Sequence, residues 1–113
     1  MGFEMGKQFV LDAAEIRPLA PGPGSCIATD RITVDGHPVG YMYREKPHNE
    51  LDSGWRFFAG DEPEEYTEQP ANFELYDVNT IANYDPEIVQ LLGAPIGSAY
   101  RRGDSGKLIP ANQ

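Results

Sequence analysis

The chain has 113 residues, with 18 Asp and Glu against 9 Lys and Arg, which gives a formal net charge of −9 at pH 7. This length suits one ordinary domain and is too short for two. Binding to nucleic acid or to an anionic membrane needs a basic surface, so the composition argues against both partners.

The acidic residues are concentrated in the middle third of the chain. No Lys or Arg occurs from Phe57 to Tyr100. A segment of one charge sign would attract a basic protein partner, although it also serves plain solubility. The segment holds nine carboxylates: Asp61, Glu62, Glu64, Glu65, Glu68, Glu74, Asp77, Asp85 and Glu87.

Cysteine use and hydropathy indicate a cytoplasmic protein. Cys26 is the single cysteine, which excludes an intrachain disulfide and a thiolate metal cluster and suits a reducing compartment. The N-terminus lacks a basic-then-apolar signal pattern, and no apolar run approaches the roughly 20 residues of a membrane helix.

The first 23 residues differ from the rest. Phe9, Val10, Ala13 and Ile16 lie near helical spacing and predict a short helix, and the Pro-Gly-Pro-Gly run at 21–24 ends regular structure. We therefore expect an N-terminal arm over 1–23, followed by a single domain over 24–113.

The first half of this domain is predicted to consist of strands. A strand at 26–29 continues through 32–34 past a bulge, and Asp35-Gly36 is typical of a hairpin turn. In the returning strand, 39–44, alternation places Val39, Tyr41 and Tyr43 on one face. A third strand is expected at 55–59.

The second half alternates short helices with strands. Asp85-Pro86 is typical of a helix start, and Ile88, Leu91 and Leu92 give that helix an apolar side. These patterns predict an α+β fold, with an antiparallel β-sheet of about four to six strands and two or three short helices. The other expected elements are a helical turn at 62–66, a strand at 72–76, a turn at 77–83, and strands at 97–101 and 108–109.

One polar cluster could form a site. If the second and third strands are neighbours, Arg44 and Arg56 would approach Asp52, Asp61 and Glu62 at one end of the sheet. Two interpretations stay open: Arg–carboxylate pairs that hold loops around a core Trp55, or a recognition surface of Trp, Tyr and Arg. The candidate partner-binding residues are Arg44, Glu45, Asp52, Trp55, Arg56, Asp61, Glu62, Glu64, Glu65 and Glu68.

No catalytic residue, metal ion or cofactor is predicted. The acidic run 61–68 has neither the central glycine of a calcium loop nor a histidine or cysteine for zinc. Gly103-Asp104-Ser105-Gly106 looks like the surroundings of a protease nucleophile, but the sequence indicates no histidine base for it. The alternative is an enzyme or small-ligand binder that uses Arg44, Asp52, Trp55 and Asp61.

Several segments, in order, resemble one bacterial family, the immunity protein 33 family. They are 26–30, 39–45, 52–57, 60–62, 79–83, Asp85-Pro86 with Ile88, and 97–100, so the resemblance covers about residues 24–109. It implies a protein that binds and blocks a cognate polymorphic toxin, without known catalytic residues. A stand-alone regulatory interaction domain, as a monomer or weak dimer, is the other implication.

Overall fold

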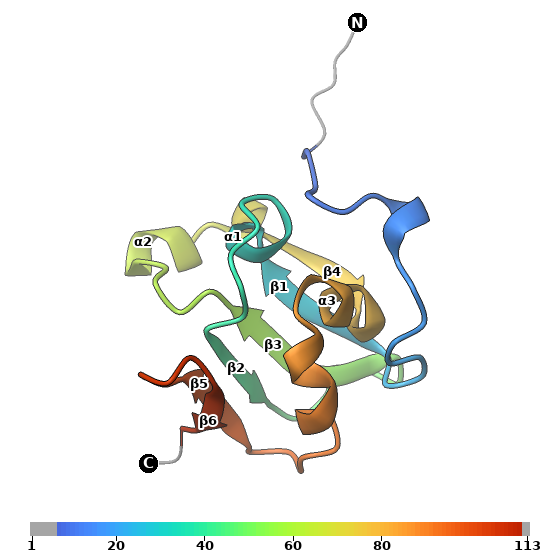
Figure 1. Cartoon of the computed structure of the whole chain (residues 1–113), viewed down its shortest axis with the longest axis vertical. Helices are drawn as coiled ribbons and strands as arrows, with labels where there is room; N and C mark the ends of the chain where they lie inside the picture. Colours follow the sequence, from blue (N-terminus) through green and yellow to red (C-terminus); the bar gives the residue numbers. More distant parts are fainter. Residues whose placement is uncertain (1–6, 112–113) are drawn as a thin grey trace, which may run out of the picture.

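A computed structural model of the chain describes residues 7–111 and shows a six-stranded sheet with short helices around it (Figure 1). The strand order is β4-β1-β3-β2-β5-β6, and only the β1–β3 pair is parallel. The predicted α+β class is confirmed, and the sheet, which was expected to be antiparallel, is antiparallel except for this one pair. The strands are β1 Ser25–Thr29, β2 Tyr41–Arg44, β3 Asp52–Phe58, β4 Phe73–Asp77, β5 Ala99–Arg102 and β6 Leu108–Pro110.

The helices are short. Asp85 caps η3 by accepting a hydrogen bond from the Glu87 N–H, and Pro86 occupies its first turn, as predicted. None of the helices between residues 7 and 111 is both long and apolar enough to cross a bilayer. The α-helices are α1 Asp30–Thr33, α2 Glu64–Thr67 and α3 Val78–Tyr84, and the 3-10 helices are η1 Ala13–Glu15, η2 Pro70–Asn72 and η3 Pro86–Leu91.

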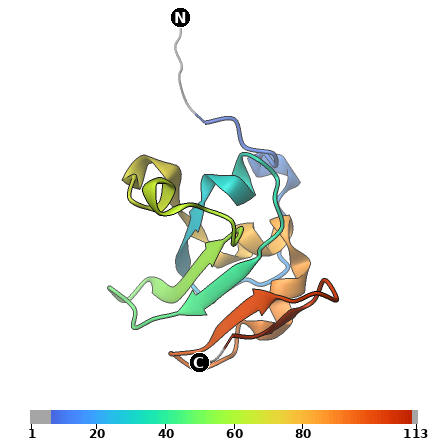
Figure 2. The same cartoon turned by 90° about the vertical axis from the view of Figure 1, so that its left-hand side faces the viewer.

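The core lies between the sheet and the pair α3–η3. Side chains alternate along a strand, so every second residue of β1, β2 and β3 faces the helices. Figure 2 shows α3 and η3 on one side of the sheet and α2 on the other. The fully buried residues that meet in this layer are Cys26, Ala28, Met42, Trp55, Phe57, Val78, Ile81, Ala82 and Ile88.

The hairpin predicted at Asp35-Gly36 is wrong. Ile32 and Thr33 belong to α1, where both are buried, and β2 pairs with β3 and β5 and not with β1. Gly36 has a φ of +80° and donates its N–H to the Ile32 carbonyl, so it ends a helix. An Asp-Gly pair suits both roles, because each needs a residue that adopts positive φ.

The turn predicted at 77–83 is also wrong, because α3 occupies it. Val78, Ile81 and Ala82 lie at helical spacing and are buried against the sheet, and the Asp77 side chain caps the helix by accepting from the Asn79 N–H. Burial of this apolar side outweighs the low helix propensity of the neighbouring Asn and Thr residues.

The helix expected from Phe9 to Ile16 is reduced to the single 3-10 turn η1. The rest of the arm between residues 7 and 24 runs without regular structure along the helix side of the domain (Figure 1). Gly22 and Gly24, in the Pro-Gly-Pro-Gly run, adopt φ values of +109° and +113°, so this run turns the chain into β1.

Candidate functional site

The face of the sheet opposite α3 and η3, called the open face here, carries a row of aromatic rings. Tyr43 stacks on Phe58 at 5.9 Å between ring centroids, Tyr41 lies 5.8 Å from Tyr43, and Phe73 meets Phe58 edge-on at 6.0 Å. The outward side chains that make up the open face are Ile27, Tyr41, Tyr43, Arg56, Phe58, Phe73, Leu75 and Arg101.

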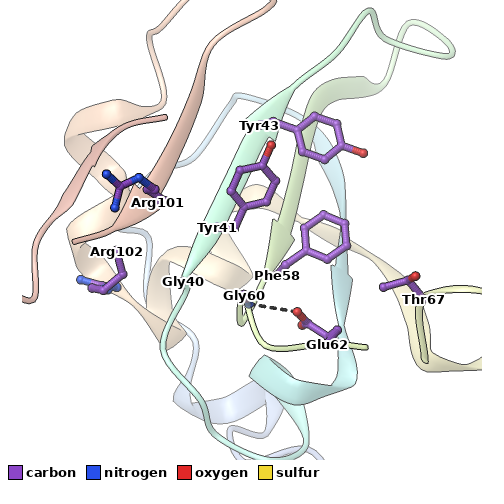
Figure 3. Close-up of a pocket in the computed structure, with 9 residues that line it drawn as sticks. All are labelled: Gly40, Tyr41, Tyr43, Phe58, Gly60, Glu62, Thr67, Arg101 and Arg102. Carbon is purple, nitrogen blue, oxygen red and sulfur yellow. Dashed lines mark hydrogen bonds between the residues drawn. The ribbon is translucent and has the colours of Figure 1, made fainter. Parts of the chain in front are cut away.

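A groove of about 500 Å³ lies on the open face between these rings and α2 (Figure 3). Glu62 forms part of its wall and is fixed by three hydrogen bonds: from the Ala59 N–H at 2.7 Å, the Gly60 N–H at 2.9 Å and the Thr29 hydroxyl at 2.8 Å. A Cβ atom on Gly40 would lie 1.8 Å from the Ala59 carbonyl oxygen, so this close approach of two chain segments requires glycine.

Arg56 is the most buried charged residue of the open face, with 3% exposure. Its guanidinium donates to Asp52 through Nη1 and Nη2, at 2.9 and 2.7 Å, and to Glu45 through Nε, at 2.6 Å. These bonds hold the pKa of the Asp52 carboxyl well below its usual range. Asp52 also accepts from the His48 and Gly54 N–H groups, so the network fixes the loop between β2 and β3.

Trp55 and Arg44 lie on the covered side of the sheet. Trp55 has no exposed surface, stacks on Phe57, and donates its indole N–H to the Leu92 carbonyl at 3.3 Å. Arg44 lies over the Trp55 ring at 5.8 Å and donates to the Ser53 and Ala94 carbonyls. In this fold Trp55 is a core anchor, as in the first of the two interpretations.

The expected meeting of both arginines with Asp61 and Glu62 is wrong. Asp52 begins β3, whereas Asp61 and Glu62 follow its end, and a seven-residue strand of about 20 Å separates the two groups. Asp61 instead pairs with Arg31 at 2.6 Å, and this hydrogen bond lowers the pKa of Asp61. Of the candidate residues, the structure therefore brings Glu45, Asp52 and Arg56 together on the open face and Arg44 and Trp55 together on the covered side.

The residues proposed for an enzymatic site do not share a pocket. Asp52, Arg44 and Asp61 line three different surface hollows, and Trp55 is buried. Among the side chains described between residues 7 and 111, no three His, Cys, Asp or Glu gather closely enough to hold a metal ion.

Three carboxylates of the acidic segment remain exposed on α2 and at its C-cap: Glu64, Glu65 and Glu68, called the acidic rim here. None has an ion-pair partner within the described part of the chain, whereas Asp85 and Glu87 both pair with Arg102. Because Thr67 of the same helix lines the groove, the acidic rim borders the open face.

Sequence reasoning missed most of the aromatic row. Alternation placed Tyr41 and Tyr43 on one face, and their 5.8 Å contact agrees with that. Phe58 lies on β3 and Phe73 follows on β4, and both strands pair with β1. The parallel pairing of β1 with β3 has no local sequence signal, so the contact between these two rings could not be predicted.

No curated protein and no solved structure matches the chain. The sequence does match the family described as Immunity protein Imm33 domain over residues 26–112, a span that contains α1, α2, α3 and the strands from Cys26 on, and that leaves out the arm. The chain belongs to the immunity protein 33 family.

Proposed function

We propose that the protein is a non-enzymatic immunity protein that binds a cognate toxin in the bacterial cytoplasm and blocks it, with the open face as the contact surface. Family membership supports the class of function. The choice of surface rests on the row of four contacting aromatic rings, which lies on the sheet face that α3 and η3 do not cover. Aromatic side chains and arginine are enriched at the centre of protein interfaces.

Hydrogen bonds fix side chains at both ends of the open face without any partner. Three side chains, Glu45, Asp52 and Arg56, hold one end of it, and the Glu62 hydrogen bonds hold the other. A preformed surface loses little conformational entropy on binding, so more of the contact free energy appears as affinity.

The acidic rim favours a basic toxin, such as a nuclease. Exposed charges of one sign at the edge of an interface raise the association rate with a partner of opposite sign, and salt screens this effect. The rim carboxylates belong to the segment from Phe57 to Tyr100, which lacks Lys and Arg. The candidate contacts from the sequence that remain accessible in this arrangement are Glu45, Asp61, Glu62, Glu64, Glu65 and Glu68.

Reversing the rim charges tests this proposal. The variant E64K/E65K/E68K should associate about tenfold more slowly with the toxin encoded beside the gene at low salt, and the difference should shrink at high salt. Stopped-flow association measured over a salt series is the readout. The unfolding midpoint should stay nearly unchanged, because these side chains are exposed and unpaired.

The matched control is D12K/E50K/D104K, which changes the net charge equally at exposed positions outside α2. If both variants slow association to the same degree, only the total charge matters and the acidic rim has no role. If neither variant changes the rate, the rim serves solubility and the toxin binds without it.

A further inference from the structure

The Glu62 carboxylate is fixed in the wall of the groove and can still accept a further hydrogen bond. Its Oε2 accepts from the Thr29 hydroxyl at 2.8 Å and from the Ala59 N–H at 2.7 Å. Its Oε1 accepts one described hydrogen bond, from the Gly60 N–H at 2.9 Å. Each oxygen of a carboxylate has two acceptor sites. Oε1 can therefore take one more donor, and its direction is set before that donor arrives.

Within the described part of the chain, no cation neutralises this carboxylate. None of the ion pairs between residues 7 and 111 includes Glu62. Two arginines line the same groove, but Arg102 is already paired with two carboxylates of the chain. The other, Arg101, lies beyond Tyr41 as seen from Glu62 (Figure 3). Because Glu62 is half-buried, a cation that reaches it is attracted more strongly than at a fully exposed carboxylate.

Aromatic rings form the other wall of the groove. Tyr41 and Phe58 are opposite residues of β2 and β3, with ring centroids 6.1 Å apart, and Tyr43 stacks on Phe58. Figure 3 shows the Phe58 ring between Tyr43 and Glu62. The faces of Tyr and Phe rings attract cations, and a planar guanidinium stacks on them well. The groove therefore combines a carboxylate with rings that favour the same kind of group.

This combination suits an arginine side chain. An apolar side chain would take water away from Glu62 without replacing its hydrogen bond, and an acidic one would be repelled. Arginine supplies an N–H donor for Oε1, a planar cation for the rings and an apolar stem for the rest of the groove. The volume of about 500 Å³ lies in the range of pockets that bind small ligands, so such a long side chain has room.

We propose that the groove is an arginine-binding pocket, in which an arginine of the toxin donates to the Glu62 Oε1 and stacks against Phe58 and Tyr41. The toxin as the source of this arginine rests on the proposed function. The pocket adds a residue type that the toxin must present. It also gives Glu62 a short-range role, which differs from the long-range attraction exerted by the acidic rim.

The first test needs no toxin. The full chain is titrated with the methylamide of Nα-acetyl-arginine and, in parallel, with that of Nα-acetyl-citrulline, which has nearly the same shape without the charge. The amide chemical shifts of Gly40 and Gly60 report on the groove that they line, and Gly93, which does not line it, is the reference. The arginine compound should bind with a dissociation constant on the order of a few millimolar. The citrulline compound should bind about tenfold more weakly.

Replacing Glu62 by Gln should remove the preference for arginine over citrulline. The comparison of two ligands separates loss of charge from a disturbed groove, because a disturbed groove weakens both. Thr29→Val is the matched variant: it removes one of the three hydrogen bonds to Glu62 but keeps the carboxylate, so the preference should stay. Glu50→Gln removes an exposed carboxylate away from the groove and should change neither affinity.

A second variant acts on the rings and leaves the carboxylate in place. Phe58→Leu should weaken binding of the arginine compound about threefold and that of the citrulline compound less. An unchanged preference in Glu62→Gln would overturn the proposal. So would a wild-type chain in which the shifts of Gly40 and Gly60 do not respond to the arginine compound, or a Phe58→Leu variant that binds both compounds as the wild type does.

The last test uses a cognate toxin and titration calorimetry. Glu62→Gln should weaken the complex at least about tenfold, whereas Glu50→Gln should leave its affinity unchanged. A wild-type chain that binds no toxin would overturn the proposed function. A toxin that binds equally well to the wild type and to Glu62→Gln would overturn the arginine pocket alone, and the open face could still be the contact surface.

Discussion

Replacing Trp55 by Ala should lower the free energy of unfolding by about 3–5 kcal/mol, and the folded variant should keep the affinity of the protein for its toxin. Trp55 is completely buried, contacts Phe57 and donates to the Leu92 carbonyl. Its loss leaves a cavity between the sheet and η3. Urea unfolding followed by circular dichroism gives the stability, and titration calorimetry at a temperature where the variant is folded gives the affinity.

The control for this substitution is Leu75→Ala. Leu75 lies on β4 with 71% of its surface exposed, so its loss should change stability by less than about 0.5 kcal/mol. A Trp55→Ala variant that stays stable but loses its partner would show that Trp55 contacts the toxin, and the assignment of this residue to the core would be wrong.

Replacing Arg56 by Met should cost about 3–5 kcal/mol of unfolding free energy, because the Asp52 carboxylate would remain buried without its cation. Asp52 is 6% exposed at its side chain, and Arg56 is 3% exposed. The double variant D52N/R56M should lose less than the sum of the two single variants, since the residues interact directly. Arg101→Met, on the same face but exposed, is the matched control.

The same ion pair gives the protein an acid-sensitive stability. The pKa of Asp52 is lower in the folded chain than in the unfolded chain. In the unfolded chain this pKa is about 4. Below that pH the unfolded chain takes up the proton first, so the free energy of unfolding falls as the pH drops toward the folded pKa. Above about pH 5 the contribution is complete. In Arg56→Met this acid slope should be shallower, and an unchanged slope would contradict the assigned network.

The elements that the sequence predicted well are those with a local physical signal. Asp85-Pro86 supplies both an N-cap and a first-turn proline, which is typical of a helix start, and the strand predicted at 72–76 is observed as β4. Asp35-Gly36 failed because its positive φ suits a helix end as well as a hairpin. The α3 helix was missed because its three buried residues stand among poor helix formers.

The candidate site was predictable only in part. Residue type identified Arg56 and Asp52 as partners, but it did not reveal that Trp55 faces the helices. Asp61 follows the end of β3, whereas Asp52, the partner of Arg56, begins the strand, because an extended strand carries the chain far from its start. Only the strand order shows which aromatic rings meet.

The most direct test of the central claim is the dissociation constant of the complex proposed between the full chain and a cognate toxin, measured for Y41A/Y43A and for V89A. Tyr41 and Tyr43 form the aromatic row with Phe58, whereas Val89 is an exposed apolar residue of η3, on the other side of the sheet. The account predicts at least about a hundredfold weaker binding for Y41A/Y43A, as expected for central aromatic contacts, and no change for V89A. Equal affinity of the two variants would place the toxin away from the open face and contradict the account.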